Sequence, residues 1–480
     1  MCGILGIFGY TDVSREIAFG LTCLQHRGQD AAGVVTFNKH FRIKKGNGLV
    51  NQVFDDKILS QLEAPCGLGH VRYATQGLND IQEAQPIYMN YPFGLAMVHN
   101  GNVVNFSHLA KTLREQNRVI ETTNDLELIL CTLASNLEGK NLKNFSVDDL
   151  FDAVESTQKM VSGAYAAIAL LAGQGMLAFC DPHGIRPLVL GKKISERGTV
   201  YSFSSETCAL ESLGFEVVRE LQAGEAVFID NQRNLHSKIL HHKAPAFCVF
   251  EYIYFARDDS VINNTLVAKE RVRMGKALAK SFEKFAIHPD VVIDVPSSAY
   301  FSASGLAEEL QVPYRRGLAK NPYIGRSFLF PTQSQRDMAV RQKLSPIKPI
   351  IAGKKVAVID DSIVRGTTSR RIVNLLRETG AEKVYFVSAA PPVKFPCVYG
   401  IDMSVKTELI AGNNSIEDIS KYLGADAIIY QSLEDLQEIF KDRGLCTACF
   451  SGCYPTGISS ELLYEIECER MHSKASAILG

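Results

Sequence analysis

Short apolar runs of strand length, separated by glycine-rich turns, fill the first 240 residues of the chain. Segments with apolar residues at helical spacing lie between them, and Ser107 and Asn124 are suited to cap two of these helices. Glycines interrupt the long uncharged stretch 161–180, which indicates a buried β-hairpin. The first half is therefore predicted to mix strands and helices. The predicted strands cover residues 3–8, 32–37, 66–73, 94–98, 164–171, 200–203 and 226–229.

Beyond residue 240 the pattern changes to one apolar strand followed by one amphipathic helix, repeated. This order is typical of right-handed βαβ units on a parallel sheet. We expect domains over 2–240 and 241–430, followed by a helical, cysteine-containing segment over 431–480. The predicted strands are 291–295, 356–359, 383–388 and 427–430, and the predicted helices are 302–310, 369–379 and two that start at Ser415 and Ser432.

Composition narrows the possible partners. The 480 residues are 46% hydrophobic and 21% charged, which is ordinary globular usage. The net charge of -1 provides no long-range field to attract nucleic acid or anionic lipid, so we expect neither as a partner. No run is typical of a membrane span. Twelve cysteines without a secretory signal indicate a reducing, cytoplasmic location.

Cys2 directly follows the initiator Met1, and a small second residue favours removal of that methionine. The thiol and the α-amine of one residue would then lie together. Their ordinary pKa values, near ~8.5 and ~8, allow a proton to pass between them at little cost. Cys2 is thus a candidate nucleophile that carries its own base.

Three further segments accompany Cys2: LQHRGQD at 24–30, GHVRYAT at 69–75 and HNGN at 99–102. With the N-terminal MCGI they resemble the N-terminal-nucleophile glutamine amidotransferases over the first 240 residues. The resemblance implies a four-layer αββα glutaminase fold. It also implies that Cys2 attacks the glutamine carboxamide, releasing ammonia, while Asn100 and Gly101 stabilise the oxyanion.

The same resemblance implies how glutamine is held. Arg72 suits the α-carboxylate, because a guanidinium fork matches two oxygens, and Asp125 suits the α-ammonium group. Arg27 and Gly28 are expected on a loop that closes over the substrate. The histidines at 26, 70 and 99 are expected to be structural, since this class of nucleophile needs no imidazole.

The segment VAVIDDSIVRGTTS at 356–369 carries the second chemistry. A buried strand ends at Asp360 and Asp361, whose carboxylates suit Mg²⁺ and ribose hydroxyls. Glycine, small hydroxyl residues and free N–H groups then form a phosphate cradle at a helix start. The motif GxxxxGK[ST] is absent from the sequence, so this is not a nucleotide-triphosphate P-loop. The segment resembles the phosphoribosylpyrophosphate (PRPP) motif of type I phosphoribosyltransferases.

Together the two halves resemble the glutamine PRPP amidotransferases over nearly the whole chain. The resemblance implies that ammonia travels from Cys2 through an apolar channel to C1 of PRPP, giving phosphoribosylamine, glutamate and pyrophosphate. It also implies a Mg²⁺ site that includes Ser298, a homotetramer, and feedback inhibition by purine nucleotides. The implied PRPP-binding residues are Lys320, Tyr323, Arg326, Lys343, Asp360, Asp361, Arg365, Gly366, Thr367, Thr368 and Ser369.

Cys446 and Cys449 have metal-ligand spacing, which by itself leaves zinc, iron–sulfur and unligated thiols open. The iron–sulfur branch of the resembled family has ligands in the contexts that Cys248 and Cys397 occupy here, so the resemblance implies a structural 4Fe–4S cluster on these four cysteines. Two positions depart from the family pattern: Asp258 replaces a proline, and Ser297 replaces an acid beside Ser298.

Two alternatives remain open from the sequence. One is a related amidotransferase of specialised metabolism that supplies ammonia to another phosphoribosyl acceptor, which would keep every residue named above. The other is a non-catalytic, PRPP-sensing regulator of transcription. A regulator would need a basic DNA-binding motif, whereas this near-neutral chain has an intact Cys2.

Overall fold

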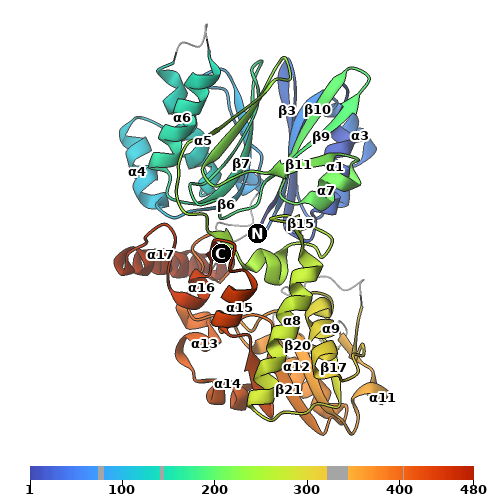
Figure 1. Ribbon diagram of the computed structural model, residues 1–480. Coiled ribbons are helices and arrows are strands. Elements are labelled where there is room, and N and C mark those ends of the chain that lie inside the picture. Colours follow the sequence, from blue (N-terminus) through green and yellow to red (C-terminus); the bar gives the residue numbers. More distant parts are fainter. Residues whose placement is uncertain (74–80, 141–144, 322–343, 404, 480) are drawn as a thin grey trace.

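The computed structural model describes residues 1–73, 81–140, 145–321, 344–403 and 405–479. Two domains are stacked end to end, and the N-terminus lies at the junction between them (Figure 1). The first domain is a sandwich of two antiparallel sheets, with strand orders β11-β9-β10-β1-β4-β2-β3 and β13-β12-β8-β7-β6-β5. Its strands are β1 (Gly3–Phe8), β2 (Ala31–Asn38), β3 (His40–Asn47), β4 (Cys66–Arg72), β5 (Ile87–Met89), β6 (Leu95–Val103), β7 (Gly163–Leu171), β8 (Gly175–Cys180), β9 (Val189–Ser195), β10 (Gly198–Ser204), β11 (Glu216–Glu220), β12 (Glu225–Asp230) and β13 (Leu235–Ile239).

The two sheets face each other across one apolar core, in which Ile4 and Leu68 of one sheet pack with Val98 and Ile168 of the other. Helices cover both outer faces of the sandwich. The predicted αββα layers are therefore confirmed, and so is the hairpin within 161–180. The helices are α1 (Ser14–Cys23), α2 (Val50–Val53), α3 (Asp56–Gln61) and α7 (Thr207–Ser212) on the first sheet, and α4 (Phe106–Glu115), α5 (Asp125–Glu138) and α6 (Val147–Met160) on the second.

One of the two helix caps predicted for the first domain is correct. The Asn124 side chain accepts a hydrogen bond from the backbone N–H of Leu126 at the start of α5. The prediction for Ser107 is wrong, because α4 begins at Phe106 and Ser107 lies inside it. The Ser107 hydroxyl instead donates to Glu469 of the C-terminal helix at 2.6 Å.

The second domain contains a parallel sheet in the order β17-β20-β21-β22, with helices on both faces. Alternate residues of each strand are buried against α8 and α9 on one face and against α12 and α14 on the other. The bounds are β17 (Val291–Asp294), β20 (Lys355–Asp360), β21 (Lys383–Ser388), β22 (Ala427–Tyr430), α8 (Val267–Lys284), α9 (Tyr300–Leu310), α12 (Thr367–Glu378) and α14 (Ile416–Leu423).

The order of this sheet reverses between β17 and β20. After β17 the chain passes along the outer edge of that strand, where Tyr314 forms a parallel bridge with Val292. It then crosses to the other side of β17 and forms β20. Ligands of open α/β sheets bind at the carboxyl ends of the strands that flank such a reversal. Here those ends carry Asp294 and Asp360, each the last residue of its strand.

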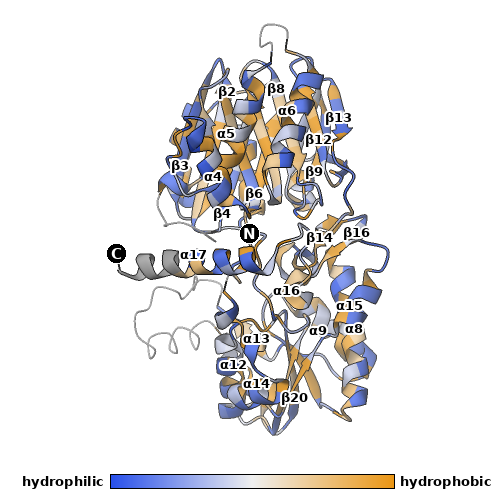
Figure 2. Cartoon of the chain, turned by 90° about the vertical axis from the view of Figure 1, so that its left-hand side faces the viewer, coloured by the Kyte–Doolittle hydropathy of each residue, from blue (hydrophilic) through white to orange (hydrophobic). Residues whose placement is uncertain are grey.

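The C-terminal segment returns to the junction. β14 (Phe247–Cys248) pairs in parallel with β23 (Leu445–Cys446), and α17 (Ser460–Leu479) lies across the boundary between the domains (Figure 2). No helix of the described ranges is both long and apolar enough to span a membrane. The remaining elements are β15 (Val261–Ile262), β16 (Thr265–Leu266), β18 (Leu318–Lys320), β19 (Leu344–Pro346), α11 (Lys348–Ile351), α13 (Ile410–Asn413), α15 (Leu433–Ile439), α16 (Ala448–Ser451), the 3-10 turns Ile81–Glu83 and Lys406–Glu408, and the π-helical turn Glu251–Phe255.

Candidate active sites

Cys2 lies immediately before β1, at the end of the sandwich that faces the second domain. Its backbone nitrogen donates to Asn100 Oδ1 at 3.1 Å, and its Sγ lies 3.9 Å from the carbonyl oxygen of Tyr73. Asn100 belongs to β6 of the opposite sheet. The thiol is thus held between the two sheets, at the end of the sandwich nearest the second domain.

The bond from Cys2 fixes the orientation of the Asn100 amide. Since Oδ1 faces Cys2, the amide nitrogen Nδ2 points away from it, and this buried nitrogen has no hydrogen-bond partner among the described residues. A buried amide donor without a partner is costly unless a ligand uses it. The next residue, Gly101, must be glycine, because a Cβ there would lie 1.9 Å from the Ala164 carbonyl oxygen.

Arg72 and Asp125 approach this end from different elements. Arg72 is the last residue of β4 and is 5% exposed. Asp125 is the first residue of α5, where its Oδ2 accepts from the Val103 N–H at 2.9 Å. Burial alone would raise the pKa of the Asp125 carboxyl, but His99 and the Val103 N–H hold it below its usual range. The Arg72 guanidinium and the ionised Asp125 carboxylate therefore lie at the same end of the first domain as Cys2.

His99 was expected to be structural, and its hydrogen bonds define that role more closely. Its backbone N–H donates to Gln85 Oε1 at 2.7 Å, so the Gln85 amide nitrogen faces the ring, 2.8 Å from Nδ1. Because an amide nitrogen only donates, Nδ1 must be the unprotonated nitrogen. The protonated Nε2 then lies 3.3 Å from Asp125 Oδ1. The only sequence signal for this role was the position of His99 beside Asn100.

Arg27 lies in the turn after α1 and is buried, with 1% exposure. Its Nε donates to the Cys2 carbonyl oxygen at 3.0 Å, and its terminal nitrogens bind Glu206 and Glu251. Burial opposes the charge, but these two carboxylates raise the pKa of Arg27 above its usual range. Arg27 thus holds the backbone carbonyl group of Cys2. Gly28 allows the turn to pack closely, since a Cβ there would lie 2.5 Å from the Arg72 backbone.

Asp360 and Asp361 lie at the carboxyl end of β20, and Asp360 is 8% exposed. Burial and the neighbouring Asp361 raise the pKa of Asp360 well above its usual range. Asp361 accepts hydrogen bonds from the hydroxyls of Ser298 and Ser362. Burial also raises the pKa of Asp361, although these hydroxyls oppose the rise. Two crowded carboxyls beside a serine hydroxyl fit a hard divalent cation such as Mg²⁺.

The loop after these acids ends in a helix start, as predicted. Gly366 adopts φ +74° as the residue before α12, and Thr367, Thr368 and Ser369 form the first turn of that helix. The N–H groups of a first helical turn have no partner inside the helix and attract phosphate. Arg365 sits beside this turn, where its guanidinium binds Glu408 at 2.6 Å and lies 3.6 Å from Asp402.

The remaining residues predicted to bind PRPP are only partly covered by the structure. Lys320 ends β18, is exposed, and places its Nζ 3.5 Å from Ser297 Oγ. Tyr323, Arg326 and Lys343 lie outside the described residues. At the other departure from the family pattern, Asp258 forms an ion pair with the buried Arg271 at 2.5 Å.

The four cysteines predicted as cluster ligands are all buried in the junction core. Cys248 and Cys446 are opposite each other in the β14–β23 pair, and Cys449 lies in α16. Burial raises the pKa of the Cys248 thiol to about 11 and also raises those of Cys446 and Cys449. Among the described residues no three His, Cys, Asp or Glu side chains are close enough to hold a single metal ion. None of the twelve cysteines forms a disulfide bond.

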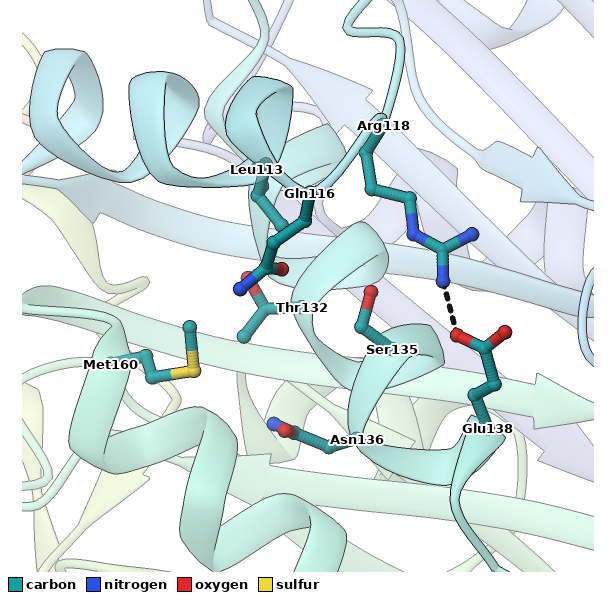
Figure 3. Close-up of a pocket in the computed structure, with 8 residues that line it drawn as sticks. All are labelled: Leu113, Gln116, Arg118, Thr132, Ser135, Asn136, Glu138 and Met160. Carbon is teal, nitrogen blue, oxygen red and sulfur yellow. Dashed lines mark hydrogen bonds and ion pairs between the residues drawn. The ribbon is translucent and has the colours of Figure 1, made fainter.

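A cavity of about 330 Å³ lies elsewhere, among α4, α5 and α6 (Figure 3). An ion pair of Arg118 with Glu138 stands at one side of it, and Thr132 and Ser135 of α5 contribute hydroxyls. None of the residues predicted for either active site lines this cavity.

Both halves of the chain match known protein families. Residues 70–212 match the glutamine amidotransferase domain, and residues 268–393 match the phosphoribosyl transferase domain. The amidophosphoribosyltransferase of Haemophilus influenzae is 45% identical over 98% of this chain and 96% of its own length, and that of Saccharomyces cerevisiae is 41% identical over 98% and 95%. The solved glutamine PRPP amidotransferase of Bacillus subtilis, complexed with ADP and GMP, is 37% identical with a TM-score of 0.85, covering 96% of this chain and 98% of that one.

The fold and its two sites therefore define a glutamine amidotransferase joined to a phosphoribosyltransferase. Sequence identity over nearly the full length identifies one family within this class. The chain belongs to the amidophosphoribosyltransferase family, the glycosyltransferases of the first committed step of purine biosynthesis. This outcome confirms the predicted fold class and enzymatic function, and it disfavours the non-catalytic regulator.

Proposed function

We propose that Cys2, exposed by removal of Met1, hydrolyses glutamine with Asn100 and Gly101 as the oxyanion donors. The observation that carries this proposal is the Asn100 amide, whose oxygen faces Cys2 and whose buried Nδ2 lacks a partner among the described residues. The thiol proton passes to the α-amine and the thiolate attacks the carboxamide carbon. The amide nitrogen then takes the proton and leaves as ammonia, and water hydrolyses the thioester to glutamate.

Arg72 and Asp125 bind the two charged groups of glutamine in this proposal. The lowered pKa of Asp125 supports it, because an ionised carboxylate is needed to bind an α-ammonium group. Arg27 and Gly28, in the turn after α1, support the site in two ways. Arg27 holds the Cys2 carbonyl group, and Gly28 allows the turn to approach Arg72.

PRPP binds at the carboxyl end of β20. Asp360 and Asp361 bind the ribose hydroxyls and, with Ser298, supply the oxygen ligands that fit Mg²⁺, which when bound neutralises pyrophosphate charge. The first turn of α12, from Thr367 to Ser369, receives the 5-phosphate. Arg365 adds positive charge beside the phosphate loop, and Gly366 provides its left-handed turn. Lys320, Tyr323, Arg326 and Lys343 complete the site around the pyrophosphate.

Ammonia crosses between the sites through the junction. One apolar cluster contains Val104, directly after the strand β6 that carries Asn100 and Gly101, and packs against Val364, which lies in the phosphate loop. An apolar environment keeps ammonia neutral and therefore nucleophilic. At C1 of PRPP the ammonia lone pair forms the new C–N bond as the bond to pyrophosphate breaks, giving phosphoribosylamine.

Cys248, Cys397, Cys446 and Cys449 are proposed to hold a structural 4Fe–4S cluster. The surroundings of the four cysteines fit an anionic cluster, because Arg186 is fully buried beside them. Its NH1 has no hydrogen-bond partner in the described chain. Burial opposes the charge on Arg186, whereas Cys248 and Cys397 raise its pKa. A buried cation suits an anionic thiolate cluster, which when bound would cross-link the C-terminal segment to the core.

We further propose that residues 2–240, 241–430 and 431–480 act as the glutaminase, transferase and C-terminal units of a cytoplasmic homotetramer. The nucleotides in the B. subtilis complex support inhibition by purine nucleotides. A related amidotransferase with a different acceptor would use the same residues, so identification of the product decides between the two.

The test compares wild type with Cys2→Ala. We expect wild type to release glutamate from glutamine, and PRPP to stimulate the release. Cys2→Ala should release none, yet still make phosphoribosylamine from ammonia and PRPP. Glutamine hydrolysis that persists in Cys2→Ala would refute the nucleophile assignment. Anaerobic preparation should give a brown protein, and a colourless protein that contains zinc would refute the cluster.

A further inference from the structure

A loop of the second domain, residues 397–400, lies directly against the strand that carries the proposed oxyanion donors. The Asn102 side chain donates to the Val398 carbonyl oxygen at 2.9 Å. Gly400 approaches Gly101 so closely that a Cβ on it would lie 2.7 Å from the Gly101 carbonyl oxygen. The backbone of one domain thus packs against the backbone of the other at the residue next to Asn100.

This loop is held from both sides. Arg186 of the first domain donates from Nε to the Tyr399 carbonyl oxygen at 2.9 Å. Arg470 of α17 donates to the Cys397 carbonyl oxygen at 2.8 Å. Both arginines are buried, at 1% and 8% exposure. The loop is therefore a fixed surface rather than a loose contact.

The same support extends to Cys2 through buried charges. Arg186 NH1 lies 3.7 Å from Glu251 Oε1, and Glu251 binds both terminal nitrogens of Arg27 at 3.0 and 2.8 Å. Arg27 in turn donates to the Cys2 carbonyl oxygen. Glu251 belongs to the chain segment that enters the second domain. The nucleophile and the strand with the oxyanion donors are thus both supported by groups at the junction.

We propose that Tyr399 and Gly400 are positioning residues of the glutaminase site, and that the loop 397–400 sets the place of the Gly101 N–H. This rests on the proposed function, in which Gly101 donates to the oxyanion. Gly101 lies in β6 opposite Tyr165 of β7, so β7 supports one side of it while Gly400 supports the other. The glutaminase site is complete only when the second domain is docked against it.

Gly400→Ala tests this directly. Gly400 has φ +99°, and an added methyl group would push on Gly101. Gly457→Ala is the matched control, since Gly457 has φ +71° in the C-terminal segment and has nothing within 4 Å of an added Cβ. Both substitutions place alanine in left-handed backbone, and only one presses on the oxyanion strand.

We expect Gly400→Ala to lower kcat for glutamine hydrolysis about 10- to 100-fold, with KM for glutamine changed less than about threefold. Phosphoribosylamine synthesis from ammonia should stay within about twofold of wild type, because the transferase chemistry does not use Gly101. Gly457→Ala should match wild type in all three measurements.

Undiminished glutamine hydrolysis in Gly400→Ala would overturn the proposal. So would an equal fall of both activities together with the melting temperature, which a purely structural role predicts. If Gly400→Ala does not fold, Asn102→Ala decides, since it removes the bond to Val398 without adding atoms. It should lower kcat for glutamine selectively, and full activity would overturn the proposal. A wild-type enzyme with neither activity would instead refute the proposed function.

Discussion

The backbone nitrogen of Cys2 and the side-chain oxygen of Asn100 form a 3.1 Å hydrogen bond that joins the two sheets of the sandwich where the thiol emerges. Cys2 directly precedes β1 of one sheet, and Asn100 lies in β6 of the other. One sheet presents the nucleophile and the other presents the amide. Because this bond orients the amide oxygen toward Cys2, the donor Nδ2 is left without a partner in the part of the chain that the structure describes.

Asn100→Ala should therefore impair glutamine hydrolysis selectively. Loss of one oxyanion donor lowers kcat about 10²- to 10³-fold. Synthesis from ammonia should be preserved, since Asn100 lies in the first domain. Steady-state kinetics with each nitrogen source checks both expectations. Asn105→Ala, which alters an asparagine whose bonds stay within the first domain, serves as the control. A parallel loss of both activities in Asn100→Ala would argue against an oxyanion role.

Asp125→Asn should raise KM for glutamine at least about tenfold, because a neutral amide binds an ammonium group less strongly than a carboxylate does. Binding of PRPP should not change. Measurement of KM for both substrates separates a local effect from a general one. An unchanged KM for glutamine would contradict the assignment.

The pH dependence of glutamine binding follows from the same carboxyl. Its pKa is lowered in the fold, so the charged form persists above that value and is lost only as the pH falls through it. KM for glutamine should hence stay level from neutrality down to about pH 5, well above the ordinary pKa of an aspartate. A rise in KM near pH 6 that Asp125→Asn abolishes would show that the pKa is raised instead.

Glu251→Gln should destabilise the whole chain. The substitution removes one negative charge from between Arg27 and Arg186, and breaking a buried pair by removing one partner costs about 3–5 kcal/mol. Chemical denaturation should show an earlier unfolding transition. Glu216→Gln is a control for loss of a glutamate charge, since its pair with Lys192 is exposed. Equal transitions for the two variants would contradict the importance of the buried network.

Asp360→Asn should impair the transferase reaction and spare glutamine hydrolysis, which is the opposite of the effect expected for Asn100→Ala. Phosphoribosylamine synthesis should fall with both nitrogen sources, whereas glutamine hydrolysis without PRPP should persist. The reason is that Asp360 lies at the end of β20, in the other domain. Stimulation of glutamine hydrolysis by PRPP should also be lost. Retained synthesis from ammonia would refute the location of the PRPP site.

Most of the fold could be predicted, because buried strands and amphipathic helices leave clear apolar periods. The strand 356–359 and its helix appear one or two residues from the predicted positions. The outer strands β3 and β11 were missed, since their residues are largely exposed and show no apolar run. β6 is longer than predicted because its polar half, with Asn100 and Asn102, is buried at the site.

The candidate site could be predicted as a set of residues but not as a network. Motifs pointed to Cys2, Asn100 and Asp360, whose chemistry is visible in their residue types. The burial of Arg27 between Glu206 and Glu251 could not be foreseen, because its partners are 179 and 224 residues away. Contacts of this kind depend on how the domains dock, which local sequence does not encode.

Nitrogen released at Cys2 is proposed to reach the PRPP site beside Asp360 without leaving the protein. The most direct measurement uses glutamine labelled with ¹⁵N in its amide, together with excess unlabelled ammonium. If nitrogen is channelled in this way, phosphoribosylamine formed by wild type should carry mostly ¹⁵N. Product nitrogen that matches the ammonium in solution would contradict it.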